Sequence, residues 1–282
     1  METNLEIIQP DAMAQLQRAE TETAVDIAKR YPRDLAKAKK TLLFMGTVDE
    51  DTAKSCFYKK PVDNKGTLVE GPSIRMAEIA VNCYGNIRYG SRVIEESEKW
   101  VKVQGVCFDL ENNLSYAADV QRSIWSESYN KRYSQNLIQT TIKAAAAIAV
   151  RDAVFKIVAL GMFSSELKQI KAKATGRGSD IPLPKRIENA FAYFKKIGVD
   201  EKKIFERLEV RDKTEITEDH LETLVGLKTG IEDKEFTIEE AFVPYKKEAK
   251  ENKERKVSET MSNIAKEAKK DDPSRVPPED IA

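Results

Sequence analysis

NIRYGSRVIEESEKWVKVQGVCFDLENNLSYAADVQRSIW, residues 86–125, contains three strand-like runs joined by two short polar links. In the second run, Trp100 and Lys102 alternate with Val101 and Val103, which is the period of two that a half-buried strand shows. The links, around ESEK and ENN, are too short for a crossover, so neighbouring strands must run antiparallel. This stretch therefore predicts a three-stranded antiparallel meander.

A helix is predicted on each side of the meander. Before it, GPSIRMAEIAVNCYGN has Ser73 as N-cap and Gly85 or Asn86 as the stop signal. After it, SQNLIQTTIKAAAAIAVRDAVFKIVALGMF has a broad apolar face and an alanine run that permits close packing on a sheet, with Gly161 as the expected C-cap. The fold class that follows is α+β: a three-stranded antiparallel meander packed on a long helix, with N-terminal helices and a C-terminal helical module.

Composition shifts divide the rest of the chain. KKPVDNKGTLVEGPS predicts a loop or a loose hairpin, and GRGSDIPLP is the best linker candidate. In the module after it, Thr217 followed by His220 does not form the usual capping-box pair. The expected organisation is an N-terminal helical region (1–57), an α+β core (58–178), a C-terminal helical module (179–244) and a charged, disordered tail (245–282).

Charge is uneven although the 282 residues carry 47 basic and 47 acidic side chains. The core has 18 Lys and Arg against 12 Asp and Glu, and the C-terminal module has 11 against 16. Blocks of opposite sign suggest one surface for a polyanion and another for proteins. The plainer interpretation is that helical surfaces simply drift in charge.

Several classes of function have no motif in this sequence. The three cysteines, Cys56, Cys83 and Cys107, lack metal-type spacing and are expected to be reduced, buried small hydrophobes. His220 is the single histidine, so a structural zinc site is not expected. Neither G-x-x-x-x-G-K-[ST] nor G-x-G-x-x-G occurs, and there is no secretion signal and no apolar run that would cross a membrane. We expect a cytoplasmic protein with no cofactor and no catalytic site.

Single-stranded DNA requires cations along its phosphates and planar side chains for its bases. The segment that joins the third strand to the long helix is rich in both. On the helix, Arg151 is in phase with Lys143, whereas Lys156 lies about 140° further round, so one continuous basic stripe is not assured. The predicted DNA-binding residues are Arg75, Arg88, Arg92, Arg122, Trp125, Tyr129, Lys131, Arg132, Tyr133, Lys143, Arg151 and Lys156.

The same residues also permit a purely structural interpretation. Arg122 would then pair with Asp119 or Glu127, Arg151 would pair with Asp152, and the aromatic side chains would pack in the core.

The order of elements resembles the core of the RecT/Redβ/Erf superfamily of phage single-strand annealing proteins. GPSIRMAEIA, VQGVCFDLENNLSYAADVQRSI and NLIQTTIKAAAAIAVRDAVFKIV are similar to the corresponding segments of that family, and the C-terminal segment is similar to helical modules of phage recombination proteins. The resemblance covers about residues 58–243 and rests on pattern and order.

The resemblance implies ATP-independent binding and annealing of single strands in phage-type homologous recombination and DNA repair, with no bond made or broken. It implies a homo-oligomer, as a ring or a helical filament. It also implies that the C-terminal module docks a host single-strand-binding protein or a phage exonuclease. No membrane partner is expected.

Two alternatives remain. A metal-dependent DNA-processing enzyme would use carboxylates such as Asp109, Glu111 and Asp119, which gather around one hairpin. A phage structural or scaffolding protein would use the charged helices for assembly, and its basic core would be incidental.

Overall fold

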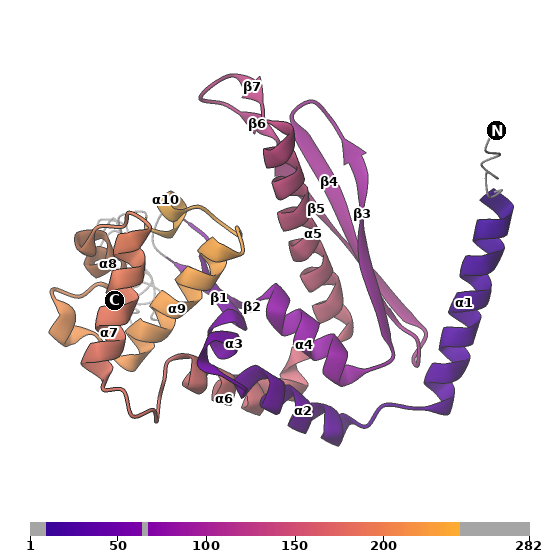
Figure 1. Ribbon diagram of the computed structural model, residues 1–282, viewed down its shortest axis with the longest axis horizontal. Coiled ribbons are helices and arrows are strands. Elements are labelled where there is room, and N and C mark those ends of the chain that lie inside the picture. Colours follow the sequence, from indigo (N-terminus) through magenta and orange to yellow (C-terminus); the bar gives the residue numbers. More distant parts are fainter. Residues whose placement is uncertain (1–9, 64–66, 243–282) are drawn as a thin grey trace, which may run out of the picture.

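The computed structural model describes residues 10–63 and 67–242 (Figure 1). Its centre is a three-stranded antiparallel sheet in the order β3-β4-β5, formed by β3 (Ile87–Glu96), β4 (Trp100–Asp109) and β5 (Leu114–Ser123). The long helix α5 (Gln135–Ile157) packs on one face of this sheet, mainly along β4 and β5. The predicted α+β class and the predicted meander are therefore confirmed.

The alternation of β4 explains which face is covered. Val101, Val103 and Cys107 are at most 1% exposed and face α5. Gly105 lies between them, where a Cβ atom would come within 2.2 Å of the Ala149 backbone. The backbone of the alanine-rich helix α5 therefore lies in contact with the backbone of β4 where the two cross. Such a close approach requires a glycine on the strand and small residues on the helix.

The end of α5 differs from the prediction. Ser134 caps the first turn by accepting a hydrogen bond from the Leu137 backbone, but the helix ends at Ile157, four residues before Gly161. Val158 adopts an extended conformation, and a short 3-10 helix, η1 (Leu160–Phe163), follows. Both Val158 and Phe163 are fully buried. Because these side chains enter the core, the helix ends before Gly161, the residue that was predicted to cap it.

The N-terminal region comprises α1 (Pro10–Arg30), α2 (Leu35–Thr47) and α3 (Glu50–Ser55), and the last two belong to the same packing unit as the core. One hydrophobic cluster joins α2 and α3 to α4 (Ile74–Tyr84), α5 and α6 (Ser164–Ala174). The expected boundary after residue 57 does not separate two packed bodies.

Helix α1 is attached differently. Among its residues 12–30, only Ala28 is buried. The Asn86 amide donates to the backbone carbonyls of Ala28 and Tyr31, and so holds the end of this helix. The helix stands beside the sheet, away from the C-terminal elements (Figure 1).

A hairpin and a helical module complete the fold. Where a loop or a loose hairpin was predicted, β1 (Phe57–Pro61) and β2 (Leu68–Pro72) pair as antiparallel strands. A second hydrophobic cluster holds the helices of the C-terminal module together. These are α7 (Leu183–Lys196), α8 (Glu201–Leu208), the short η2 (Lys213–Glu215), α9 (Glu218–Glu232) and α10 (Ile238–Ala241). The tail predicted for residues 245–282 lies outside the described residues.

The module rests on β1 through α9. A Cβ atom at Gly226 would come within 2.9 Å of the Lys59 backbone nitrogen, and Thr229 donates a hydrogen bond of 2.8 Å to the Lys54 carbonyl. At the start of α9 the prediction about capping is wrong, because a capping box is present. The Thr217 backbone N–H donates to Nδ1 of His220, so the imidazole replaces the usual glutamate.

The cysteines are free, as expected. Cys56 and Cys107 are buried, whereas Cys83 is only partly buried. Burial raises the pKa of the Cys56 thiol to about 12 and that of the Cys107 thiol to about 11. None of the helices in the described ranges has the length and apolar character needed to cross a membrane.

Candidate nucleic-acid interface

Helix α5 leaves the inner side of β3 largely uncovered. Tyr89 and Val93 of β3 pair with Cys107 and Val103 of β4, and paired residues share a face of an antiparallel sheet. Yet Tyr89 is 44% and Val93 46% exposed, while their partners are at most 1% exposed. The edge strand and the side of the helix therefore form an open trough.

A groove of about 480 Å³ lies in this trough, between α4, β3, α5 and the end of α9. Its lining combines cations, acids and other polar groups with a floor of alanines. The polar lining residues are Arg75, Glu78, Tyr89, Ser91, Thr140, Lys143, Glu232, Asp233 and Lys234. A groove with this lining can hold a phosphate beside a planar group.

Two of the predicted DNA-binding cations meet in this groove. Arg75 is exposed and pairs with Glu78 at 3.0 Å, and that hydrogen bond raises the pKa of its guanidinium. Lys143 is exposed, and no side chain of residues 10–63 and 67–242 forms a hydrogen bond or an ion pair with it. Lys143 is thus available to a ligand, as is Lys234, another exposed lysine that lines the groove.

The second cluster is a small projection, here called the tip, built by β6 (Trp125–Ser126) and β7 (Lys131–Arg132). Figure 1 shows it at the start of α5, beside the turn between β3 and β4. Tyr129 is 76% exposed, and the Lys131 ammonium lies 5.4 Å from its ring centroid. The Lys99 ammonium lies 5.1 Å from the Trp125 ring. The tip therefore presents aromatic rings together with cations.

Other predicted residues at the tip are engaged within the protein. Arg132 forms an ion pair with Glu96 and donates to the Ser97 carbonyl, which fastens the tip to the turn after β3. Tyr133 is half-buried against the cluster around Val101 and Val103, so its ring serves packing. A DNA contact of Tyr133 stays a prediction.

Arg151 is not a surface cation. Its guanidinium is buried, forms an ion pair with Glu235, binds Asp152 at 2.9 Å and lies 4.8 Å from the Tyr58 ring centroid. The prediction that Arg151 contacts DNA is therefore wrong in this structure, and the structural alternative, pairing with Asp152, is confirmed.

Arg122 also serves the protein itself. Its guanidinium donates to the backbone carbonyls of Lys234 and Glu235 at 3.3 Å, and neither Asp119 nor Glu127 is its partner. Arg122 and Arg151 thus converge on the turn that follows α9. Both hold the C-terminal module against the core.

The remaining predicted cations lie on other faces. Arg88 and Arg92 pair across strands with Phe108 and Gln104, on the sheet face opposite to α5. Arg88 lies 3.7 Å from Glu20 of α1, and Arg92 donates to the Gln104 side chain. The prediction that Arg88, Arg92 and Lys143 line one groove is therefore wrong. Side chains alternate along β3, and this places both arginines on the face of the sheet away from Lys143.

Lys156 is exposed, but it lines a different hollow from the one that Lys143 lines. That hollow, of about 640 Å³, lies between α5, β1 and β5, and is lined also by Tyr116 and Phe155. The basic stripe along α5 is therefore interrupted, as its helical phase indicated. Lys143 and Lys156 do not form one surface.

The groove includes residues that sequence reasoning missed, above all Tyr89. Tyr89 and Val93 are an even number of positions apart, so both lie on the inner face of β3, and the sequence carries that signal. The sequence does not reveal that α5 covers only two of three strands, which is what exposes the ring.

The three carboxylates of the proposed metal alternative do not converge. Asp109 and Glu111 bind Arg33, whereas Asp119 lies on the other face of the sheet and pairs with Lys102 at 2.9 Å. Burial alone would raise the pKa of Asp109, but hydrogen bonds from Arg33 and Asn112 outweigh it and hold that pKa below its usual range. Within the described ranges, no three His, Cys, Asp or Glu residues are grouped so as to hold a metal ion.

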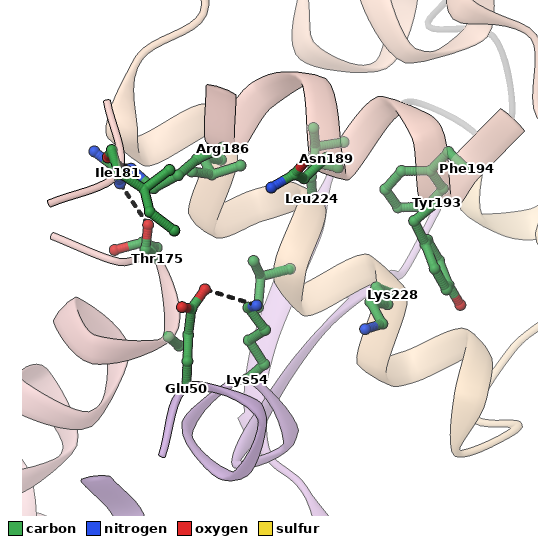
Figure 2. A pocket seen from close by; sticks show the side chains of 14 residues that line it. Glu50, Lys54, Thr175, Ile181, Arg186, Asn189, Tyr193, Phe194, Leu224 and Lys228 are labelled. Atoms are coloured by element: carbon green, nitrogen blue, oxygen red, sulfur yellow. Dashed lines mark hydrogen bonds and ion pairs between the residues drawn. The ribbon is translucent and has the colours of Figure 1, made fainter. Parts of the chain in front are cut away.

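A smaller and more enclosed pocket, of about 120 Å³, lies where the core meets the C-terminal module. Figure 2 shows Lys54 joined to Glu50 on one side of the pocket, with Phe194 and Leu224 on the module side. Lys54 forms an ion pair with Glu50 at 2.7 Å. Lys228 lies 3.8 Å from Glu232, and its ammonium lies 4.8 Å from the Tyr193 ring centroid, so both lysines of the pocket have partners within the protein.

The chain matches no protein-family model, no curated protein and no solved structure. The groove and the tip are therefore interpreted from their own geometry.

Proposed function

We propose that this protein binds single-stranded DNA and anneals complementary strands without ATP, in phage-type homologous recombination. The observation that carries the proposal is the uncovered side of β3, where Tyr89 and the unpaired Lys143 share a groove. The exposed Tyr129 and Lys131 of the tip lie at the start of the same helix. Exposed rings favour single strands over duplex, because a base can stack on a side chain only when it is unpaired.

The resemblance extends the proposal to assembly and partners. We propose a ring or a helical filament of identical subunits in the cytoplasm. Apolar side chains that stand exposed on α1 and on the outer sheet face, such as Leu16, Ile27 and Phe108, support self-association.

We also propose the junction pocket as the dock for an acidic segment of a host single-strand-binding protein or a phage exonuclease. Two lysines that line the pocket, Lys54 and Lys228, support this assignment. Undiminished capture of the purified partner by the double variant Lys54→Glu, Lys228→Glu would contradict it.

The test of the main function is duplex formation from two complementary labelled oligonucleotides, without ATP or metal, across a salt series. The Tyr129→Ala variant should bind a single strand about tenfold more weakly, because one stacking contact is lost. The Lys143→Ala variant should lower the slope of log affinity against log salt by about one.

Matched controls come from the same chain. Tyr31 is 68% exposed near the end of α1, and Lys185 pairs with Glu188 on the surface of the C-terminal module. Tyr31→Ala and Lys185→Ala should leave binding and annealing unchanged. Annealing no faster than without protein would refute the proposal and favour a scaffolding role.

A further inference from the structure

The end of α9 brings two acids and one base to the groove. Glu232, Asp233 and Lys234 line it together with Arg75 and Lys143, and Glu232 also lies 3.8 Å from Lys228. Asp233 is the C-cap of α9, so the partial negative charge of the helix end adds to the two carboxylates. A phosphate that enters the groove therefore meets repulsion on one side and attraction on the other.

This part of the groove wall is fixed in place. Lys234 adopts the left-handed conformation, with φ of 58°, and the turn brings Glu235 onto the buried Arg151. The backbone carbonyls of the same turn accept hydrogen bonds from Arg122. These contacts hold the backbone of the segment that carries Glu232 and Asp233 beside the groove.

We propose that the end of α9 is an electrostatic gate on the groove: the protonated Asp233 side chain admits a phosphate to Arg75 and Lys143, and the ionised side chain repels it. The gate rests on the proposed function, since it regulates the same site.

The charged and titratable groups around Asp233 come from every element that surrounds it. They are Arg75 and Glu78 of α4, Tyr89 of β3, Arg122 of β5, Lys143 and Arg151 of α5, and Glu232, Lys234 and Glu235 of its own segment. Burial raises the pKa of the Asp233 carboxyl to about 6, Glu235 and Glu232 add to the shift, and Arg75 and Arg151 oppose it. The gate is therefore expected to change state near pH 6.

Histidine is the other side chain that commonly titrates near pH 6, and the chain has one histidine. His220 lies at the opposite end of α9, about 20 Å away along the helix axis. Because glutamine also serves in a capping box, His220→Gln removes the imidazole and keeps a cap.

The experiment is titration of fluorescent oligothymidylate with the full chain between about pH 5 and pH 8. Thymine does not titrate in this window. Wild-type affinity should fall about tenfold as pH rises, whereas Asp233→Asn should hold the low-pH affinity throughout. His220→Gln should follow the wild type, and Lys143→Ala should lose most of the pH dependence together with part of its affinity.

The outcomes separate the gate from the function. If wild type and Asp233→Asn weaken in parallel, or if Lys143→Ala keeps the full pH dependence, the gate is refuted and DNA binding stands. If His220→Gln alone abolishes the dependence, the histidine is responsible and the gate is refuted. Absence of binding by every variant at every pH refutes the proposed function and the gate with it.

Discussion

Arg151 and Glu235 form a buried ion pair between α5 and the turn after α9. Each side chain is less than 10% exposed, and Asp152 and the Tyr58 ring complete the surroundings of the guanidinium. An isolated charge at such a site is costly, whereas the pair itself adds little compared with apolar residues of similar size.

Glu235→Ala should therefore lower the free energy of unfolding by about 3 kcal/mol, since it leaves the Arg151 charge buried beside a single carboxylate. The double variant Arg151→Met, Glu235→Leu should recover most of that loss. Denaturant unfolding measures both, and Glu188→Ala in an exposed pair is the control. Equal destabilisation of the single and double variants would contradict this account.

Arg151 is an example of a residue whose position on a helix can be predicted from the sequence but whose partner cannot. The spacing from Lys143 indicated a shared helical face but not a partner 84 positions away along the chain. The Ser73 cap was predictable because its partner, the Met76 backbone N–H, is local. His220 was missed because an imidazole rarely takes the glutamate position in a capping box.

At the level of elements, the contact between β4 and α5 positions the groove. The close approach at Gly105 fixes the helix over β4 and β5, and this leaves β3 open. The sequence predicted strands and helix from periodicity, yet the lateral position of the helix depends on packing across distant segments. The same limit concealed the end of α5, where burial of Val158 overrides the signal at Gly161.

Gly105→Ala should destabilise the protein by about 2 kcal/mol or more, because the added methyl group meets the backbone of Ala149 and either the strand or the helix must shift. Gly90, on β3 of the same sheet, has open space around it, so Gly90→Ala is the matched control. Thermal unfolding of the two variants tests this prediction. Equal unfolding midpoints would show that the backbones of α5 and β4 are not in close contact at Gly105.

At the level of the whole molecule, the C-terminal module is a wall of the core rather than an appendage. Val225 of α9 belongs to the same hydrophobic cluster as Leu42 and Met76, and Lys59 of β1 pairs with Glu222 at 3.3 Å. GRGSDIPLP does lie largely between two helices, α6 and α7, as predicted for a linker. Its composition gave no information on how firmly the helices after it pack against the core.

Removal of residues 179–282 should therefore weaken the core. The fragment 1–178 should unfold at a lower temperature than the full chain and bind a hydrophobic dye, because the cluster around Val225 and one wall of the groove are lost. A fragment that unfolds at the temperature of the full chain would show that the core is autonomous. Point variants at Lys54 and Lys228 are the safer way to map partners.

The tip has a practical optical consequence. The chain has two tryptophans, and both Trp100, at the start of β4, and Trp125, in β6, lie at the tip end of the sheet. Intrinsic indole emission therefore reports on this end of the molecule alone and is silent about the C-terminal module. A stacked base that quenches this light would register occupancy of the tip without any attached dye.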